Sequence, residues 1–245
     1  MWRRFVLLGG TLILLVCVAK LLPPNMHDRL YEAQKAEQQL LSQSAFASGY
    51  FPPEYAEPSL DCGYGNGPIE IIGDVESDWY PGQLSAAREP SLYLMAEQEE
   101  PPEFALRFTY LPSFSPSVFI RVEKEGDDYW LIVKHLSGAG GYDAGTIASS
   151  NRKPLSDRQV GQLTRMLSES AFFDEPTEEC RMGFDGTQWI FEQVDASGYR
   201  MVKRWSPDEG KARELGELLI ELSGLDPPSS PTISALFRNL IVESF

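Results

Sequence analysis

The stretch Gly183–Gly224 constrains the fold most, because it carries the pattern of a complete β-hairpin followed by a helix. Residues Thr187–Val194 alternate in polarity and are rich in aromatic and β-branched side chains, which predicts a strand. Residues Asp195–Gly198 predict a turn, because Gly198 is free to adopt a positive φ. The alternation resumes in Tyr199–Trp205, which therefore predicts the second strand of the hairpin.

The helix that follows has signals at its start, along its face and at its end. Ser206 is the predicted N-cap, Pro207 the first helical residue and Glu209 the partner in a capping box. Gly224 predicts the C-terminal stop. Four leucines repeat at helical spacing and form one apolar face: Leu215, Leu218, Leu219 and Leu222. We expect this helix to lie back on the hairpin, so that the leucines are buried.

The rest of the body predicts further strands and one more helix. Alternation predicts strands at Phe104–Tyr110, Val118–Glu123 and Tyr129–Leu136, with a short one at Ile69–Ile72. Ser156 and Gln159 form a capping box before a helix whose apolar face is Val160, Leu163, Met166 and Leu167. We therefore predict an α+β fold, an antiparallel sheet built from β-hairpins with two helices packed on one face.

The N-terminus predicts a membrane segment. Arg3 and Arg4 precede an apolar stretch from Phe5 to Leu22 of about 18 residues, which is long enough for a transmembrane helix. A cleaved signal peptide is the competing interpretation, but Cys17 and Val16 make poor processing sites. The arginines predict a cytoplasmic N-terminus and a periplasmic body, anchored to the inner membrane.

The chain divides into four predicted parts. Residues 1–22 are the transmembrane signal-anchor, and residues 23–59 are a stalk helix and a Pro-rich linker. Residues 60–225 are the extracytoplasmic α+β domain, and residues 226–245 are a linker and a C-terminal amphipathic helix. The apolar face of that helix comprises Ile233, Leu236, Phe237, Leu240 and Ile241, and it either docks on its own domain or contacts a partner protein.

The chain is acidic, which excludes one class of partner. It has 21 Lys+Arg against 36 Asp+Glu, a formal net charge of −15. So negative a protein repels phosphates, and we therefore expect no nucleic-acid partner. The sequence does not predict an oligomeric state.

Two cysteines lie in the body, Cys62 and Cys180. An oxidising compartment would allow them to form a disulfide, and two unrelated thiols are the alternative.

A glycine-rich stretch, Ser137–Gly145, follows a predicted strand but is not a phosphate loop, because it has neither G-x-G-x-x-G nor Gly-Lys-Ser/Thr. Its glycines favour a chain that bends or lies close to the sheet. The alternative is a loop that contacts a ligand through Gly138, Gly140, Gly141, Tyr142 and Asp143.

Other chemistry has little support in the residues. With two histidines, His27 and His135, and no G-x-S-x-G motif, the sequence predicts no Ser–His–Asp site, no metal site and no cofactor. The acids in Asp74–Asp78 favour a solvated turn over a calcium loop. Trp130, Trp189, Trp205 and Tyr199 are typical of a core, with an aromatic binding surface as the alternative. Asp143 and Asp185 are weak candidates for a catalytic carboxylate pair.

Four runs resemble those of an uncharacterised group of bacterial membrane-anchored or exported proteins: Glu89–Leu92, Leu136–Asp143 with Gly145, Asp185-Gly186 with Trp189, Ile190 and Glu192, and Arg204–Pro207. The resemblance covers residues 75–225 and implies a bacterial origin and a shared fold, but no activity. The acidic surface and the tail beyond Leu225 depart from the group, so partner contacts are not carried over.

The sequence thus predicts a membrane-anchored extracytoplasmic protein with a non-catalytic binding or envelope-interaction role. The alternative is a hydrolase that acts on an envelope polymer through loop carboxylates.

Overall fold

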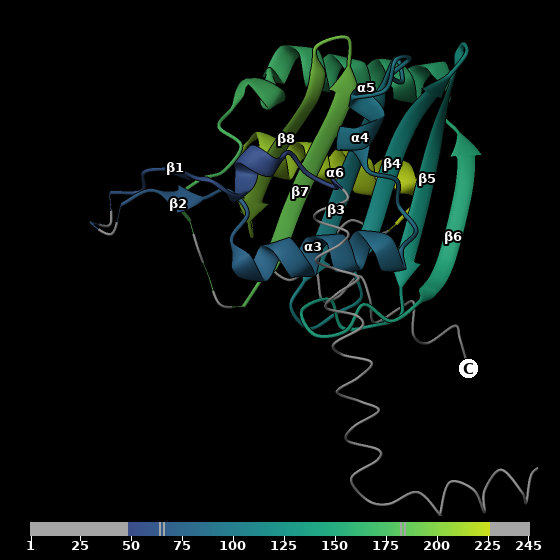
Figure 1. Cartoon of the computed structure of the whole chain (residues 1–245). Coiled ribbons are helices and arrows are strands. Elements are labelled where there is room, and N and C mark those ends of the chain that lie inside the picture. Colours follow the sequence, from purple (N-terminus) through teal and green to yellow (C-terminus); the bar gives the residue numbers. More distant parts are fainter. Residues whose placement is uncertain (1–48, 64, 66, 182, 184, 226–245) are drawn as a thin grey trace, which may run out of the picture. The chain divides into compact units, whose positions relative to one another are not determined.

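The computed structural model describes residues 49–63, 65, 67–181, 183 and 185–225. Its centre is a six-stranded antiparallel sheet with the strand order β6-β5-β4-β3-β7-β8 (Figure 1). The strands are β3 Ala105–Pro112, β4 Val118–Glu125, β5 Asp128–Leu136, β6 Ile147–Pro154, β7 Thr187–Asp195 and β8 Gly198–Trp205. The predicted α+β class and antiparallel sheet are confirmed.

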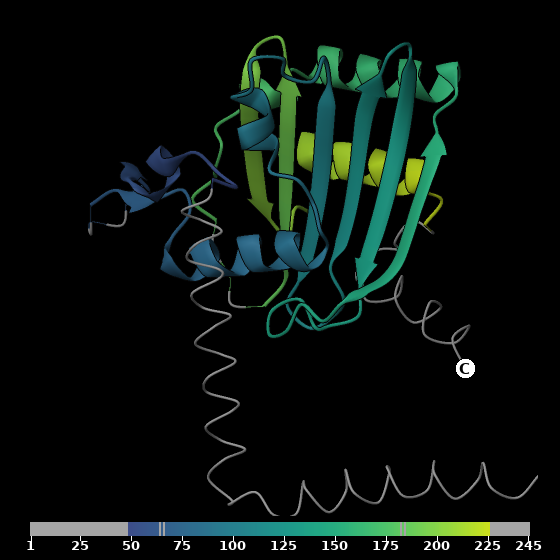
Figure 2. The same cartoon turned by 45° about the vertical axis from the view of Figure 1, so that its right-hand side comes forward.

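One face of the sheet carries the larger core. Helices α5 (Asp157–Ser170) and α6 (Lys211–Ser223) lie across this face (Figure 2). Phe108, Trp189 and Phe191 project from the central strands toward them, and all three side chains are fully buried. The leucines of α6 are also buried, as its apolar face predicts.

The opposite face is covered as well, which the sequence did not predict. Helices α3 (Asp74–Ala86) and α4 (Leu92–Ala96) lie on it (Figure 1). Tyr80 and Leu84 of α3 pack with Phe119 and Ile190 of the sheet in a second core. The expectation of helices on one face is therefore incomplete. Helix α3 lacks a regular apolar face because Pro81 and Gln83 stand among its buried residues.

The predicted start of the helix that follows β8 is wrong. Helix α6 has its N-cap at Gly210, whereas Ser206 has a φ of 44° and lies outside the helix. The Ser206 hydroxyl accepts a hydrogen bond from the Thr187 amide at 2.9 Å, and this contact closes the base of the β7–β8 hairpin. The other helix signals are confirmed, because Gly224 ends α6 with a φ of 84° and Ser156 and Gln159 cap α5.

Strand β6 was not predicted. It is an edge strand whose side chains are mostly exposed on both faces, so it has no alternation of polarity to detect. The acids Asp74–Asp78, predicted as a turn, form the start of α3.

The packed region also begins before Leu60. A 3₁₀ turn at Pro53–Ala56 leads to a small sheet of β1 (Pro58–Leu60) and β2 (Ile69–Glu70), and Phe51 is already buried in the second core. A second 3₁₀ turn follows α5 at Phe172–Asp174.

Three predictions lie outside the described residues: the anchor at 1–22, the stalk helix, and the C-terminal helix with its apolar face at Ile233–Ile241. Within the described ranges, every helix is too short or too polar to cross a bilayer.

Candidate functional site

Three loops meet where β3 ends and β4 begins. They are the β3–β4 loop Ser113–Ser117, the glycine-rich loop at 137–146, and the approach to β7 at Gly186. Ser113 joins them, because its carbonyl accepts a hydrogen bond from Gly141 N at 3.1 Å and its amide donates to Gly186 O at 2.9 Å. We call this region the loop end.

Backbone groups of Gly140 bind the glycine-rich loop to neighbouring segments. Gly140 N donates to Ser115 O at 2.8 Å. Gly140 O accepts hydrogen bonds from two side chains of α3, those of Trp79 and Gln83. A Cβ atom at Gly140 would lie 2.6 Å from Pro112 O, so only glycine allows this approach.

Two more glycines have the same role. A Cβ atom at Gly141 would lie 2.7 Å from Ser113 O, and one at Gly138 would lie 1.9 Å from Asp143 O. The carboxylate of Asp143 accepts the Gly145 amide at 2.9 Å and so closes the turn. Close packing therefore explains these glycines, and the residues proposed from sequence as ligand contacts form the frame of the loop, with the exception of Tyr142.

This frame presents two aromatic rings to solvent. Phe114 and Tyr142 are 62% and 78% exposed, and their ring centroids lie 6.0 Å apart with an interplanar angle of 29°. We call them the aromatic pair. Sequence reasoning proposed Tyr142 but missed Phe114, whose only signal is an aromatic residue within the turn-forming run Ser113–Ser117.

The two proposed catalytic carboxylates do not form an enclosed site. Asp143 and Asp185 lie on two loops that Ser113 joins, but both side chains are exposed. A catalytic carboxylate pair is expected to face a shared cleft, and two solvent-exposed side chains do not form one. Among the described residues, no three His, Cys, Asp or Glu side chains gather as a metal site.

The remaining sequence candidates are part of the packed structure. Trp189 is fully buried in the larger core, and Tyr199 packs against the second core. Trp130 lies under the guanidinium of Arg152, 4.0 Å from its ring centroid. Burial lowers the pKa of His135 on β5. Trp205 borders the loop end, where its indole occupies the space that a side chain at Gly183 would need.

A buried ionic network lies on the α3–α4 face of the sheet. Arg107 on β3 donates to Glu192 on β7 from two nitrogens, at 2.8 and 2.6 Å, and both side chains are fully buried. Arg121 and Lys134 contact Glu89 at 2.8 and 2.7 Å. Glu89 also lies 3.7 Å from Arg107, so the network joins β3, β4, β5 and β7 to the connection between α3 and α4.

The cations of this network compensate for the burial of Glu89 more fully than for the burial of Glu192. Burial by itself would raise the pKa of Glu89, but Arg121, Arg107 and Lys134 lower it below the ordinary value. Burial raises the pKa of Glu192 despite the attraction of Arg107. Glu89 and Glu192 both belong to the runs that carry the resemblance, and their contacts are structural.

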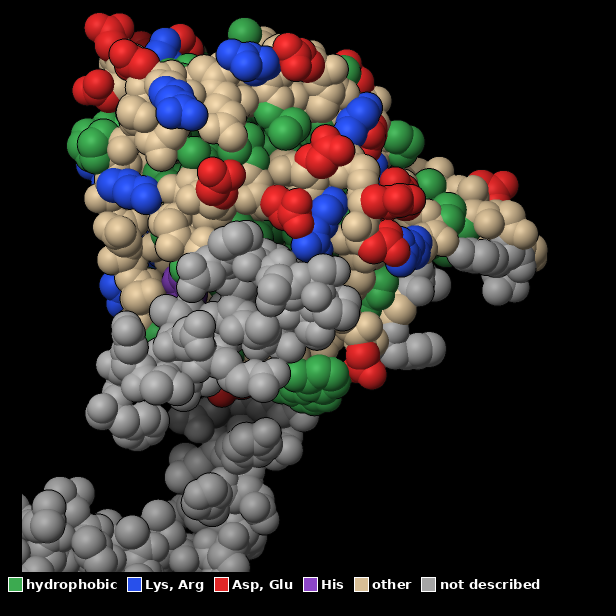
Figure 3. All heavy atoms as spheres, turned by 180° about the vertical axis from the view of Figure 1, so that it is seen from behind, with side chains coloured by type: hydrophobic (Ala, Val, Ile, Leu, Met, Phe, Trp, Pro, Cys, Tyr) green, Lys and Arg blue, Asp and Glu red, His purple; other side chains and the backbone are tan. Residues whose placement is uncertain are grey.

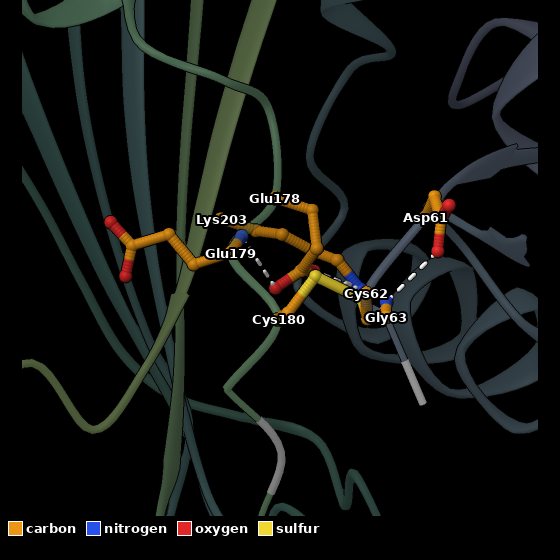
Figure 4. The surroundings of a disulfide bond; sticks show 7 residues. All are labelled: Asp61, Cys62, Gly63, Glu178, Glu179, Cys180 and Lys203. Atoms are coloured by element: carbon orange, nitrogen blue, oxygen red, sulfur yellow. Dashed lines mark hydrogen bonds and ion pairs between the residues drawn. A yellow bond between two sulfur atoms is a disulfide. The ribbon is translucent and has the colours of Figure 1, made fainter. Parts of the chain in front are cut away.

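Cys62 and Cys180 are joined by a disulfide, with Cα atoms 5.4 Å apart. Figure 4 shows Glu178 beside this bond, with its carboxylate directed at Lys203 of β8. The bond links the segment after β1 to the segment before β7.

The surface charge is mixed. On the face that carries α5 and α6, acidic and basic side chains of the described residues alternate without a broad area of one sign (Figure 3). The described side chains visible in this view therefore form no extended surface of one charge for a charged polymer.

No protein-family model matches the chain, and a search of curated proteins finds no match.

Proposed function

We propose that the protein is a non-catalytic binding domain of the bacterial cell envelope, anchored by residues 1–22 with its body in the periplasm, and that its ligand contacts the loop end. The aromatic pair carries this proposal. Two exposed rings on loops fixed by backbone hydrogen bonds provide apolar contact area at little cost in conformational entropy.

Two further observations support the proposal. The Cys62–Cys180 disulfide fits an oxidising compartment such as the periplasm. The net charge of −15 disfavours anionic ligands, so a neutral polysaccharide or a protein surface fits better than a phosphate-rich polymer. The C-terminal apolar face at Ile233–Ile241 stays a second predicted contact.

The test is co-sedimentation of the full chain, in detergent, with purified cell-wall sacculi and separately with envelope membranes. We expect the double variant Phe114→Ala, Tyr142→Ala to bind about thirtyfold more weakly, because an aromatic hot spot contributes about 2 kcal/mol or more. Its unfolding free energy should change by less than about 1 kcal/mol, because both rings are exposed.

The matched control is Leu94→Ala. Leu94 is an exposed apolar residue of α4, which packs at the Ala105 and Val194 end of the sheet, away from the loop end. Equal binding by the double variant and the control would refute a ligand site at the aromatic pair.

Hydrolysis through Asp143 and Asp185 is the alternative proposal, which their exposure disfavours. Incubation with the same sacculi tests this alternative. A hydrolase would release soluble fragments from them, and the double variant Asp143→Asn, Asp185→Asn would release none. No release by the unaltered chain would count against this alternative.

A further inference from the structure

The segment Glu175–Cys180 runs along the outer edge of β8, and we call it the strap. The amide of Lys203 on β8 donates to Thr177 O at 2.7 Å. The guanidinium of Arg204 donates to Pro176 O at 3.0 Å. The strap therefore covers the edge of β8 at Lys203, where a backbone amide would otherwise be free to pair with another strand.

Ion pairs add to these contacts. The Lys203 ammonium lies 2.6 Å from Glu178 in the strap and 2.7 Å from Glu76 in α3. Arg204 contacts Glu175 and Glu179, each at 2.9 Å. Glu175 also contacts Lys211 at 3.0 Å, so each of the three carboxylates of the strap lies against a cation of the packed domain.

The strap lacks the apolar anchor of other segments, because every residue in Glu175–Cys180 is exposed or only half-buried. The pair of Arg204 with Glu179, which is 57% exposed, contributes little to stability, so the nearly buried pair of Lys203 with Glu178 is the main ionic contact of the strap. A segment with few buried contacts opens at low free energy unless a covalent bond holds it. Cys180 supplies that bond at the end of the strap, through its disulfide to Cys62 (Figure 4).

We propose that the Cys62–Cys180 disulfide is a redox latch: reduction releases the strap and uncovers the edge of β8, while the rest of the sheet stays folded. The latch does not depend on the proposed ligand site, because the strap and the aromatic pair share no residue.

The reaction requires a dithiol. One thiolate of the dithiol attacks a sulfur of the disulfide, forming a mixed disulfide and freeing the other cysteine. The second dithiol sulfur then displaces the remaining cysteine. Two electrons and two protons pass from the dithiol to Cys62 and Cys180, and the dithiol becomes a cyclic disulfide.

The test is amide hydrogen exchange on the full chain in detergent, before and after treatment with dithiothreitol. A Cys17→Ser background removes the third thiol. We expect exchange at the Lys203 amide to accelerate by more than about tenfold, because its acceptor Thr177 O moves away.

The matched internal control is the amide of Val202. Successive amides of a strand point to opposite sides, so this one faces β7 and not the strap. Its exchange should stay slow, as should that of the central strands β3 and β4.

Two results would overturn the proposal. Unchanged exchange at Lys203 would mean that the strap stays in place without the disulfide. Equal acceleration at Lys203, Val202 and the central strands would mean that the bond holds the whole domain and not the strap alone. The variant Cys62→Ser, Cys180→Ser should reproduce the reduced pattern without any reductant.

Discussion

At the scale of single residues, the pairing of Arg107 with Glu192 dominates the α3–α4 face of the sheet. A buried charge is tolerated only when a partner and further hydrogen bonds compensate for lost hydration. Arg107 has both, since it contacts Glu192 and donates to Pro90 O at 2.6 Å. Tyr199 completes the arrangement by donating to Glu192 at 3.0 Å.

Arg107→Ala should therefore lower the unfolding free energy by about 3–5 kcal/mol, because it leaves Glu192 buried without its cation. Urea denaturation measures the loss. Arg181→Ala is the control, since Arg181 pairs with Asp208 at 3.2 Å in an exposed position and its loss should leave the unfolding free energy nearly unchanged. Similar losses in both variants would contradict a special role for the buried pair.

The pH dependence of stability should include a contribution from His135. Burial lowers its pKa in the folded state, so below about pH 6.5 the unfolded chain binds a proton that the folded chain does not. This contribution is fully present above that pH and is lost as the pH falls. We expect His135→Gln to lose less stability than the unaltered protein between pH 7.5 and pH 5, measured by urea denaturation at each pH. A larger loss in the variant would reverse the assigned sign.

At the scale of elements, helices α5 and α6 share a face of the sheet but differ in how closely they pack. Gly216 in α6 lies against the indole of Trp189, and a Cβ atom there would come within 2.1 Å of the ring. Gly161 in α5 faces open space, because a Cβ atom there would meet no neighbour within 4 Å. One helix thus needs its glycine and the other does not.

The two glycine-to-alanine variants should therefore shift stability in opposite directions. Gly161→Ala should stabilise the protein by up to about 1 kcal/mol, the difference in helix propensity. Gly216→Ala gains the same propensity but should destabilise by about 1–3 kcal/mol, because Trp189 must move in a packed core. Thermal unfolding of the two variants side by side measures both effects, and stabilisation by Gly216→Ala would show that the indole has room to shift.

At the scale of the whole molecule, the sheet is enclosed on both faces and the chain is closed by a long-range disulfide. Cys62 and Cys180 are 118 residues apart, and a loop of this length restricts the unfolded chain strongly. The proposed latch is a local opening of the folded protein, whereas the loop-closure entropy acts on the unfolded chain. Hydrogen exchange measures the first and denaturation measures the second.

Reduction should lower the unfolding free energy by about 4–5 kcal/mol, the loop-closure entropy that the bond removes from the unfolded chain. Urea denaturation with and without dithiothreitol measures the change. The variant Cys62→Ser, Cys180→Ser controls for the reagent, since dithiothreitol should leave its stability unchanged. A loss below about 1 kcal/mol on reduction would mean that the disulfide restricts the unfolded chain little.

Most strands and two helix ends could be predicted from residues close together in the sequence. Five of the six strands of the main sheet, β3, β4, β5, β7 and β8, were predicted from the alternation of their side chains, although β3 and most of β7 are buried on both faces. The start of α5 and the end of α6 were predicted because capping residues act within one turn of their own helix.

The tertiary structure alone decided the features that depend on partners distant in the chain. Ser206 has the chemistry of an N-cap, but Thr187 takes its hydroxyl, so α6 starts at Lys211. Helix α3 has polar Gln83 on its buried side, which is stable only because Gly140 O and Ser117 bond to it. The candidate site divides in the same way between sequence and tertiary structure. The sequence predicted Tyr142 as a ligand contact, but the pairing of Tyr142 with Phe114 depends on how three loops fold together. Local patterns determine which elements form, whereas burial and pairing of polar groups across the chain determine where those elements end and what they contact.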